Sequence, residues 1–257
     1  MFIKAKTLTG YTLQCLDGEL GKVKEFYFDD RHWTVRYLVA DTGTWLPGRQ
    51  VLIAPHALGD VNKEAKHITV NQTKKQIEDS PSLDSDKPVS RQFEEAYFGY
   101  YCWPMYWDGP FSWGAYPYIV RDCDDRRKQS KLVKEEGDAH LRSMQGVSGY
   151  HIEATDGAIG HVNDFIIDAE TWAIRYLVVD TQNWWLGKKV LVSPRWIGSV
   201  SWSDSKVLVN LTREAIKQAP EYTDWSLLTR EFEDSLHKHY DREGYWASEP
   251  THAATPR

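Results

Sequence analysis

The sequence predicts a mainly β protein made of two tandem small β-barrels, each followed by short α-helices. Three observations predict this fold class. The chain contains an internal repeat, each copy has short β-branched segments separated by turn residues, and each copy ends in segments with helical spacing. At 257 residues the chain is long enough for two modules that each bury a core.

The repeat runs through most of the chain at one fixed spacing, which indicates a duplication. We expect residues 1–120 to form the first repeat with a helical and aromatic extension, 121–138 to be a charged linker, and 139–257 to form the second repeat with its C-terminal helices. The clearest matches pair Gly10-Tyr11 with Gly149-Tyr150, Arg36-Tyr37-Leu38-Val39 with Arg175-Tyr176-Leu177-Val178, and Tyr106-Trp107 with Tyr245-Trp246.

The strands are clearest in the second copy. Residues 150–154 and 159–168 flank Asp156-Gly157, a strong signal for a hairpin because glycine tolerates a positive φ. Residues 172–180 predict a central strand that is buried on both faces. Further short strands are expected at 189–193 and 206–210, with first-copy equivalents at 50–54 and 67–71.

Helical spacing follows the strands in each copy. Thr73 with Gln76 is a capping-box pattern that opens a short helix, and 212–219 is the second-copy equivalent. Residues 90–101 and 229–240 predict longer amphipathic helices that cover a barrel.

These motifs resemble those of the tandem PRC-barrel proteins of bacteria. The resemblance rests on Gly-Tyr followed by Asp-Gly-x-x-Gly, on Asp164-Phe165, on the strand from Trp172 to Thr181, on Trp184-Trp185 and on the Arg-x-Phe-Glu helix. It extends from about residue 9 to 246. The family includes barrels in the H subunit of photosynthetic reaction centres and in a ribosome maturation factor, so the resemblance implies a docking or support module and no particular reaction.

Composition and charge argue against several classes of protein. A formal charge of −6 disfavours nucleic-acid binding. The sequence has no apolar run long enough for a membrane span and no secretory signal, so we expect a cytoplasmic protein, with peripheral association with a membrane complex left open. The scattered Cys15, Cys102 and Cys123 indicate neither disulfides nor a zinc site.

The recurring acids and the histidines do not indicate a metal or catalytic site. The acids lie at predicted turns, where aspartate accepts backbone hydrogen bonds; they are Asp17, Asp29 and Asp41 and their counterparts Asp156, Asp168 and Asp180. With a two-residue loop, His161 should face Ile152, so His151 and His161 should point to opposite faces of the hairpin. His237 and His239 should also diverge on their helix. We therefore expect no metal and no cofactor.

Arg36 and Arg175 lie within doubly buried strands and must satisfy their donors. The structural interpretation is an ion pair with an acid on the neighbouring strand, such as Glu25 or Asp164. The functional alternative is an anion or a partner's carboxylate held by the guanidinium.

Aromatic residues are abundant, with 12 Trp and 14 Tyr, and many lie in the proline-broken segment 97–118. Such a segment either packs within the chain or forms an interface, where Trp and Tyr are enriched. The candidate interaction or anion-binding residues are Arg36, Arg175, Trp45, Trp184, Trp185, Trp103, Tyr106 and Trp107.

The sequence has no glycine-rich phosphate loop, no G-x-S-x-G motif and no H-E-x-x-H motif. We therefore expect a non-enzymatic protein-interaction or scaffold module that binds a protein partner and forms a homodimer. The alternative is a binder of small ligands or anions, with or without enzyme activity, that uses the cleft between the barrels.

Overall fold

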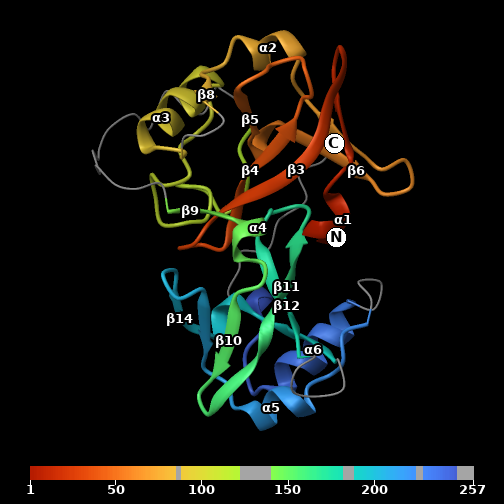
Figure 1. The fold of residues 1–257 in the computed structure, drawn as a ribbon, viewed down its shortest axis with the longest axis vertical. Helices are drawn as coiled ribbons and strands as arrows, with labels where there is room; N and C mark the ends of the chain where they lie inside the picture. The colour runs from red at the N-terminus through yellow and green to blue at the C-terminus, as the bar shows by residue number, and fades with distance from the viewer. Residues whose placement is uncertain (85–87, 122–139, 182–187, 224–227, 248–257) are drawn as a thin grey trace. The chain divides into compact units, whose positions relative to one another are not determined.

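A computed structural model describes residues 1–84, 88–121, 140–181, 188–223 and 228–247 (Figure 1). The expected linker at 121–138 therefore lies almost wholly outside the described residues. The chain divides into two compact units. Unit 1 contains Ile3–Gly146 and Asp168–Ile174, whereas unit 2 contains Val147–Ile167 and Arg175–Arg257.

The chain begins with β1 (Phe2–Lys4), and the strands of unit 1 then follow the order β6-β7-β2-β3-β4-β5-β8, with β9 paired to β3. Their bounds are β2 (Thr12–Cys15), β3 (Gly18–Asp29), β4 (Thr34–Asp41), β5 (Arg49–Ile53), β6 (Leu58–Asn62), β7 (His67–Val70), β8 (Leu83–Asp84) and β9 (Leu141–Ser143). The helices are α1 (Ala5–Leu8), η1 (Pro55–Ala57), α2 (Lys74–Glu78), α3 (Arg91–Tyr100) and α4 (Met144–Val147).

Unit 2 repeats this topology with the strand order β14-β15-β10-β11-β12-β13. Its strands are β10 (His151–Ala154), β11 (Gly157–Asp168), β12 (Ile174–Asp180), β13 (Lys189–Val192), β14 (Ile197–Ser201) and β15 (Lys206–Val209). Its helices are η3 (Pro194–Trp196), α5 (Arg213–Gln218), α6 (Arg230–His239) and η5 (Tyr245–Ala247). The predicted mainly β fold with a duplicated strand order is confirmed.

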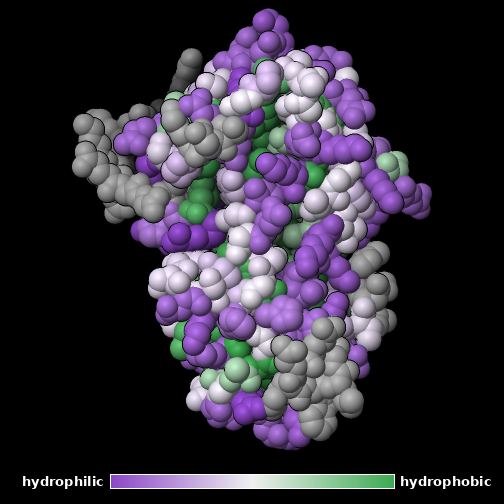
Figure 2. All heavy atoms as spheres, viewed as in Figure 1, coloured by the Kyte–Doolittle hydropathy of each residue, from purple (hydrophilic) through white to green (hydrophobic). Residues whose placement is uncertain are grey.

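Local sequence signals account for the starts of four helices. Thr73 and Gln76 form the predicted capping box at α2, and Ser90, Thr212 and Thr229 cap α3, α5 and α6 with their side chains. Every residue of β12 is buried, as expected for a central strand. The core of each unit lies between its sheet and the covering α3 or α6, and hydrophilic residues cover most of the face drawn in Figure 2.

Asp29, Asp41 and Asp168 make the predicted local turn contacts. The carboxylates of Asp41 and Asp168 accept backbone N–H groups two residues ahead, at 3.0 and 3.1 Å. Asp17 and Asp156 instead accept the backbone N–H of the first residue of α2 and α5, at 2.8 and 2.7 Å. They therefore tie the tip of each hairpin to the start of a helix.

The predicted register of the β10–β11 hairpin was wrong. The loop is Thr155-Asp156 and not Asp156-Gly157, because Ala154 pairs with Gly157, and a bulge between Ile152 and Glu153 then inserts an extra residue in β11. His151 therefore pairs with His161, and Ile152 pairs with Gly160. The same irregularity occurs in the β2–β3 hairpin between Leu13 and Gln14. Residues directly opposite each other in an antiparallel pair point to the same face of the sheet, so the two histidines share a face.

Candidate functional site

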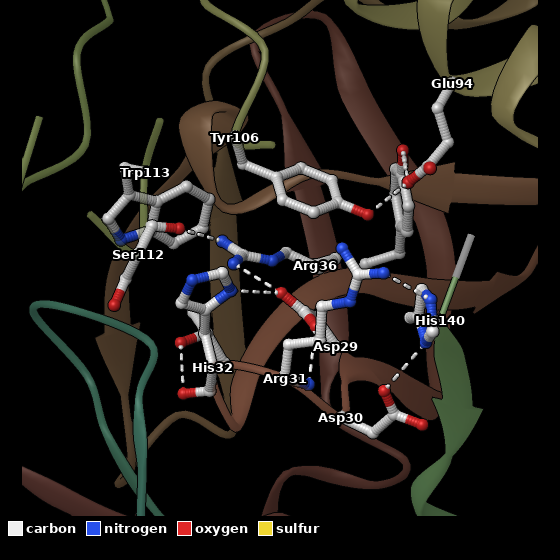
Figure 3. Close-up of polar contacts among 12 residues, drawn as sticks. Asp29, Asp30, Arg31, His32, Arg36, Glu94, Tyr106, Ser112, Trp113 and His140 are labelled. Atoms are coloured by element: carbon white, nitrogen blue, oxygen red, sulfur yellow. Dashed lines mark hydrogen bonds and ion pairs between the residues drawn. The ribbon is translucent and has the colours of Figure 1, made fainter. Parts of the chain in front are cut away.

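The arginine of the central strand in unit 1 is fully buried and forms an internal ion pair. Arg36 has no exposed surface, and its Nη2 donates to Oδ2 of Asp29 at 2.9 Å (Figure 3). Its Nη1 donates to the carbonyl of Ser112 at 2.5 Å. The expected ion pair with an acid of the neighbouring strand is present, but the acid is Asp29 of β3 and not Glu25, which accepts a hydrogen bond from Ser143.

A β-bulge explains the choice of partner. Tyr27 pairs with Tyr37 and Phe28 pairs with Val35, so Arg36 is the extra residue of β4. A bulged residue is re-aimed relative to the regular alternation of a strand. The Arg36 side chain is thereby directed to the end of β3, where Asp29 lies.

Asp29 is held by two further contacts. His32 Nδ1 lies 2.8 Å from Oδ2, and the backbone N–H of Arg31 donates to Oδ1 at 2.8 Å. Burial alone would raise the pKa of Asp29, but the hydrogen bond with His32, the charge and hydrogen bond of Arg36 and the Arg31 N–H outweigh it. The pKa therefore lies well below its usual value of 3.8, and the carboxyl is ionised at neutral pH.

Aromatic rings cover the other side of this pair. The Arg36 Cζ lies 3.9 Å from the ring centroid of Tyr106 and 4.7 Å from that of Trp113. Trp113 is almost fully buried and donates from Nε1 to the carbonyl of Thr171 at 3.1 Å. The aromatic segment at 97–118 thus packs against the core of unit 1 through these rings.

A second buried cluster lies beside the first. Glu94 of α3 accepts hydrogen bonds from the hydroxyls of Tyr37 and Tyr106, at 3.0 and 2.8 Å, and pairs with Arg91 at 2.8 Å. Burial raises the pKa of Glu94 to about 7, against the opposing effect of Arg91 and the two hydroxyls. The Glu94 carboxyl therefore titrates near neutral pH.

Unit 2 builds the same arrangement from the duplicated residues. Glu233 accepts from the hydroxyls of Tyr176 and Tyr245, at 2.8 and 3.0 Å, and pairs with Arg230 at 3.1 Å. The Cζ of Arg175 lies 3.9 Å from the Tyr245 centroid, the same distance as between Arg36 and Tyr106. Both repeats thus contain a buried Arg-Tyr-Glu-Tyr network. It fixes α3 to the central strand β4 in unit 1 and α6 to the central strand β12 in unit 2.

The remaining candidate residues lie in different surroundings. Trp103 is buried and stacks on His56 and Tyr101, with centroids 5.1 and 4.6 Å apart. Trp107 lies under the guanidinium of Arg91 at 4.1 Å, and Trp45 lies under Lys74 at 4.7 Å. Trp184 and Trp185 lie outside the described residues.

Sequence reasoning missed the roles of Glu94, Tyr37 and His32. For the first two a signal existed, because Tyr37 and Glu94 recur as Tyr176 and Glu233 at the repeat spacing. His32 had no such signal, since Thr171 occupies the matching position. Within the part of the chain that the structure describes, no group of three or more metal-ligating side chains is present, and no helix is long and apolar enough to cross a membrane.

Comparisons with known proteins agree with the repeat. The family model for the PRC-barrel domain matches residues 8–77 and 152–216, which together make up just over half of the chain. A search of curated proteins found no match. The two matched segments contain the duplicated sheets described above, and the chain therefore belongs to the PRC-barrel domain family and carries the domain twice.

Proposed function

We propose that the chain is a non-enzymatic protein-interaction module of two PRC-barrel repeats, and that a second copy of the chain is among its partners. The observation that carries this proposal is the aromatic extension of the first repeat. It presents Phe111 and Tyr118 to solvent, 41% and 43% exposed, although neighbouring Trp113 is buried. The sequence after Trp246 has no aromatic residue to match them.

The backbone that carries Phe111 is held in place by contacts within unit 1. Phe111 and Gly114 exchange backbone hydrogen bonds at 3.0 and 3.2 Å, and the carbonyl of Ser112 is bound by Arg36. Gly109 and Gly114 approach backbone atoms so closely that a Cβ would lie within 2.5 Å of them. A surface that is ordered before binding loses less conformational entropy on association, which favours an interaction role.

The buried polar groups support an interaction role over a catalytic one. Arg36 and Glu94 are buried ionisable side chains of unit 1, and each is engaged by partners within the chain. An external anion would have to displace Asp29 from a fully buried guanidinium. Binding of an anion at Arg36 therefore carries a large desolvation cost, whereas binding at the exposed rings does not.

The test is the oligomeric state of the full chain by light scattering and analytical ultracentrifugation. We expect a reversible dimer, and we expect Phe111→Ser with Tyr118→Ser to weaken it by roughly tenfold or more, as removal of interface aromatics does. Leu208→Ser is the matched control, because Leu208 is a similarly exposed apolar residue of unit 2. A wild-type chain that stays monomeric at its highest soluble concentration contradicts the proposal.

A further inference from the structure

Strands β10 and β11 form an antiparallel hairpin in unit 2 (Figure 1). His151 and His161 are direct cross-strand partners because of the bulge between Ile152 and Glu153. His151 is exposed and His161 is partly exposed, whereas Ile152 and Val162, the next residues along each strand, are buried. Both imidazoles therefore project from the outer face of the hairpin.

The hydrogen bonds show which kind of cross-strand pair this is. The N–H of His151 donates to Ser205, on the side of β15, at 2.9 Å, and the N–H of Val162 donates to the carbonyl of Tyr150 at 2.8 Å. This pattern makes His151 and His161 a non-hydrogen-bonded pair of the antiparallel hairpin. In such pairs the Cα atoms are only about 4.5 Å apart and the side chains approach most closely.

The surroundings leave both imidazoles available. Neither ring has a hydrogen-bond partner among the described residues. Lys206 lies opposite His151 on β15, but its ammonium is bound by the carboxylate of Glu153 at 2.9 Å. This ammonium is therefore paired with a carboxylate, which lowers its repulsion of a metal ion.

We propose that His151 and His161 form a surface site for one divalent first-row transition-metal ion, with water in the remaining coordination positions. Imidazole suits Cu²⁺, Ni²⁺ and Zn²⁺, and the usual order of affinity puts Cu²⁺ first. The hairpin holds both ligands on one face before binding, so the second imidazole binds as an intramolecular ligand. The bound ion links β10 to β11 beside the bulge.

The first repeat provides a matched control. Its hairpin has the same bulge, but Thr12 and Lys22 occupy the cross-strand positions. His151→Thr with His161→Lys therefore introduces residues that an equivalent hairpin already accommodates. Conversely, Thr12→His with Lys22→His places the same pair of ligands on the first hairpin.

The experiment is calorimetric titration of the full-length, untagged chain with Cu²⁺ and Zn²⁺ at neutral pH, with electron paramagnetic resonance of the Cu²⁺ complex. We expect one equivalent bound with nitrogen splittings from two imidazoles, and a loss of affinity of about tenfold or more in either single variant, His151→Thr or His161→Lys. The variant with Thr12→His and Lys22→His should bind a second equivalent. Saturating metal should raise the Tm of the wild type by a few degrees. It should leave the Tm of the variant with His151→Thr and His161→Lys unchanged.

Three results would overturn the site. They are no stoichiometric binding by the wild type, binding that both single variants retain in full, and a Cu²⁺ spectrum with one imidazole nitrogen. Circular dichroism of the variants shows whether a loss of binding reflects misfolding; a misfolded single variant is replaced by His151→Gln or His161→Gln. The oligomeric state of the wild type, measured separately, tests the proposed interaction role without any metal.

Discussion

Two buried groups of unit 1 should make its stability depend on pH in opposite directions. Glu94 is fully buried and its pKa is raised from 4.5 to about 7, so the folded state holds a proton that the unfolded state has lost. Its contribution to stability is fully present below pH 4.5 and is lost as pH rises through about 7. Between pH 5 and pH 8 this loss amounts to roughly 2–3 kcal/mol.

His56 acts in the other direction. It is buried against Phe98, Trp103 and Trp113, neither ring nitrogen has a hydrogen-bond partner among the described residues, and burial together with the charges of Arg121 and Arg36 lowers its pKa to about 3. Between these two pKa values, His56 is protonated in the unfolded state and neutral in the folded state. Its destabilising effect grows as pH falls from 6.5 towards 3, and amounts to roughly 2 kcal/mol at pH 5.

The effects of Glu94 and His56 therefore oppose each other between pH 5 and pH 8, and removing either group should leave the effect of the other. Glu94→Gln keeps an acceptor for the tyrosine hydroxyls and removes the titration, so its stability should rise over this range. His56→Phe should instead become less stable as pH rises. Urea unfolding at pH 5, 6.5 and 8, followed by tryptophan fluorescence and circular dichroism, measures both differences.

The same difference in free energy of unfolding between wild type and Glu94→Gln at pH 5 and pH 8 would contradict a raised pKa of Glu94. The acid limb below pH 4 is excluded from the comparison, because Asp29 titrates there. Its lowered pKa gives stability that is present above about pH 4 and is lost on further acidification. Glu233 of unit 2, whose pKa burial also raises, is present in both proteins and cancels in the difference.

Three further predictions concern stability and are measured by urea unfolding. Arg36→Leu should destabilise the chain by about 3–5 kcal/mol, because it removes the guanidinium that pairs with the buried Asp29 carboxylate. Lys75→Leu, which removes an exposed ion pair with Asp79, should change stability by about 1 kcal/mol or less, and equal effects would contradict this assignment. Gly160→Ala should cost about 1–3 kcal/mol or more, since its Cβ would lie 2.0 Å from the carbonyl oxygen of Asp180. Gly99→Ala, in open space within α3, should stabilise by about 0.5–1 kcal/mol, and a loss of stability there would contradict the helical assignment.

Several elements were determined by the sequence itself. The repeat, the Asp156-Gly157 hairpin, the caps at Thr73 and Thr229 and the buried central strand depend on turn chemistry, hydrophobic period and contacts within a few residues. Such contacts are encoded locally, so one copy of the pattern predicts the other. The family assignment rests on the same local pattern.

The tertiary structure alone decided the polar partners and the register. Bulges in β4 and β11 direct Arg36 to Asp29 rather than Glu25 and place His151 opposite His161, and a bulge follows from twist and packing that a hairpin loop length does not reveal. Ser112 contacts Arg36 although the two residues are 76 positions apart in the chain. Ser112 lies in a segment rich in proline and aromatic residues, whose sequence shows no helical or strand periodicity. These contacts join distant segments, and their formation depends on which surfaces the whole fold brings together.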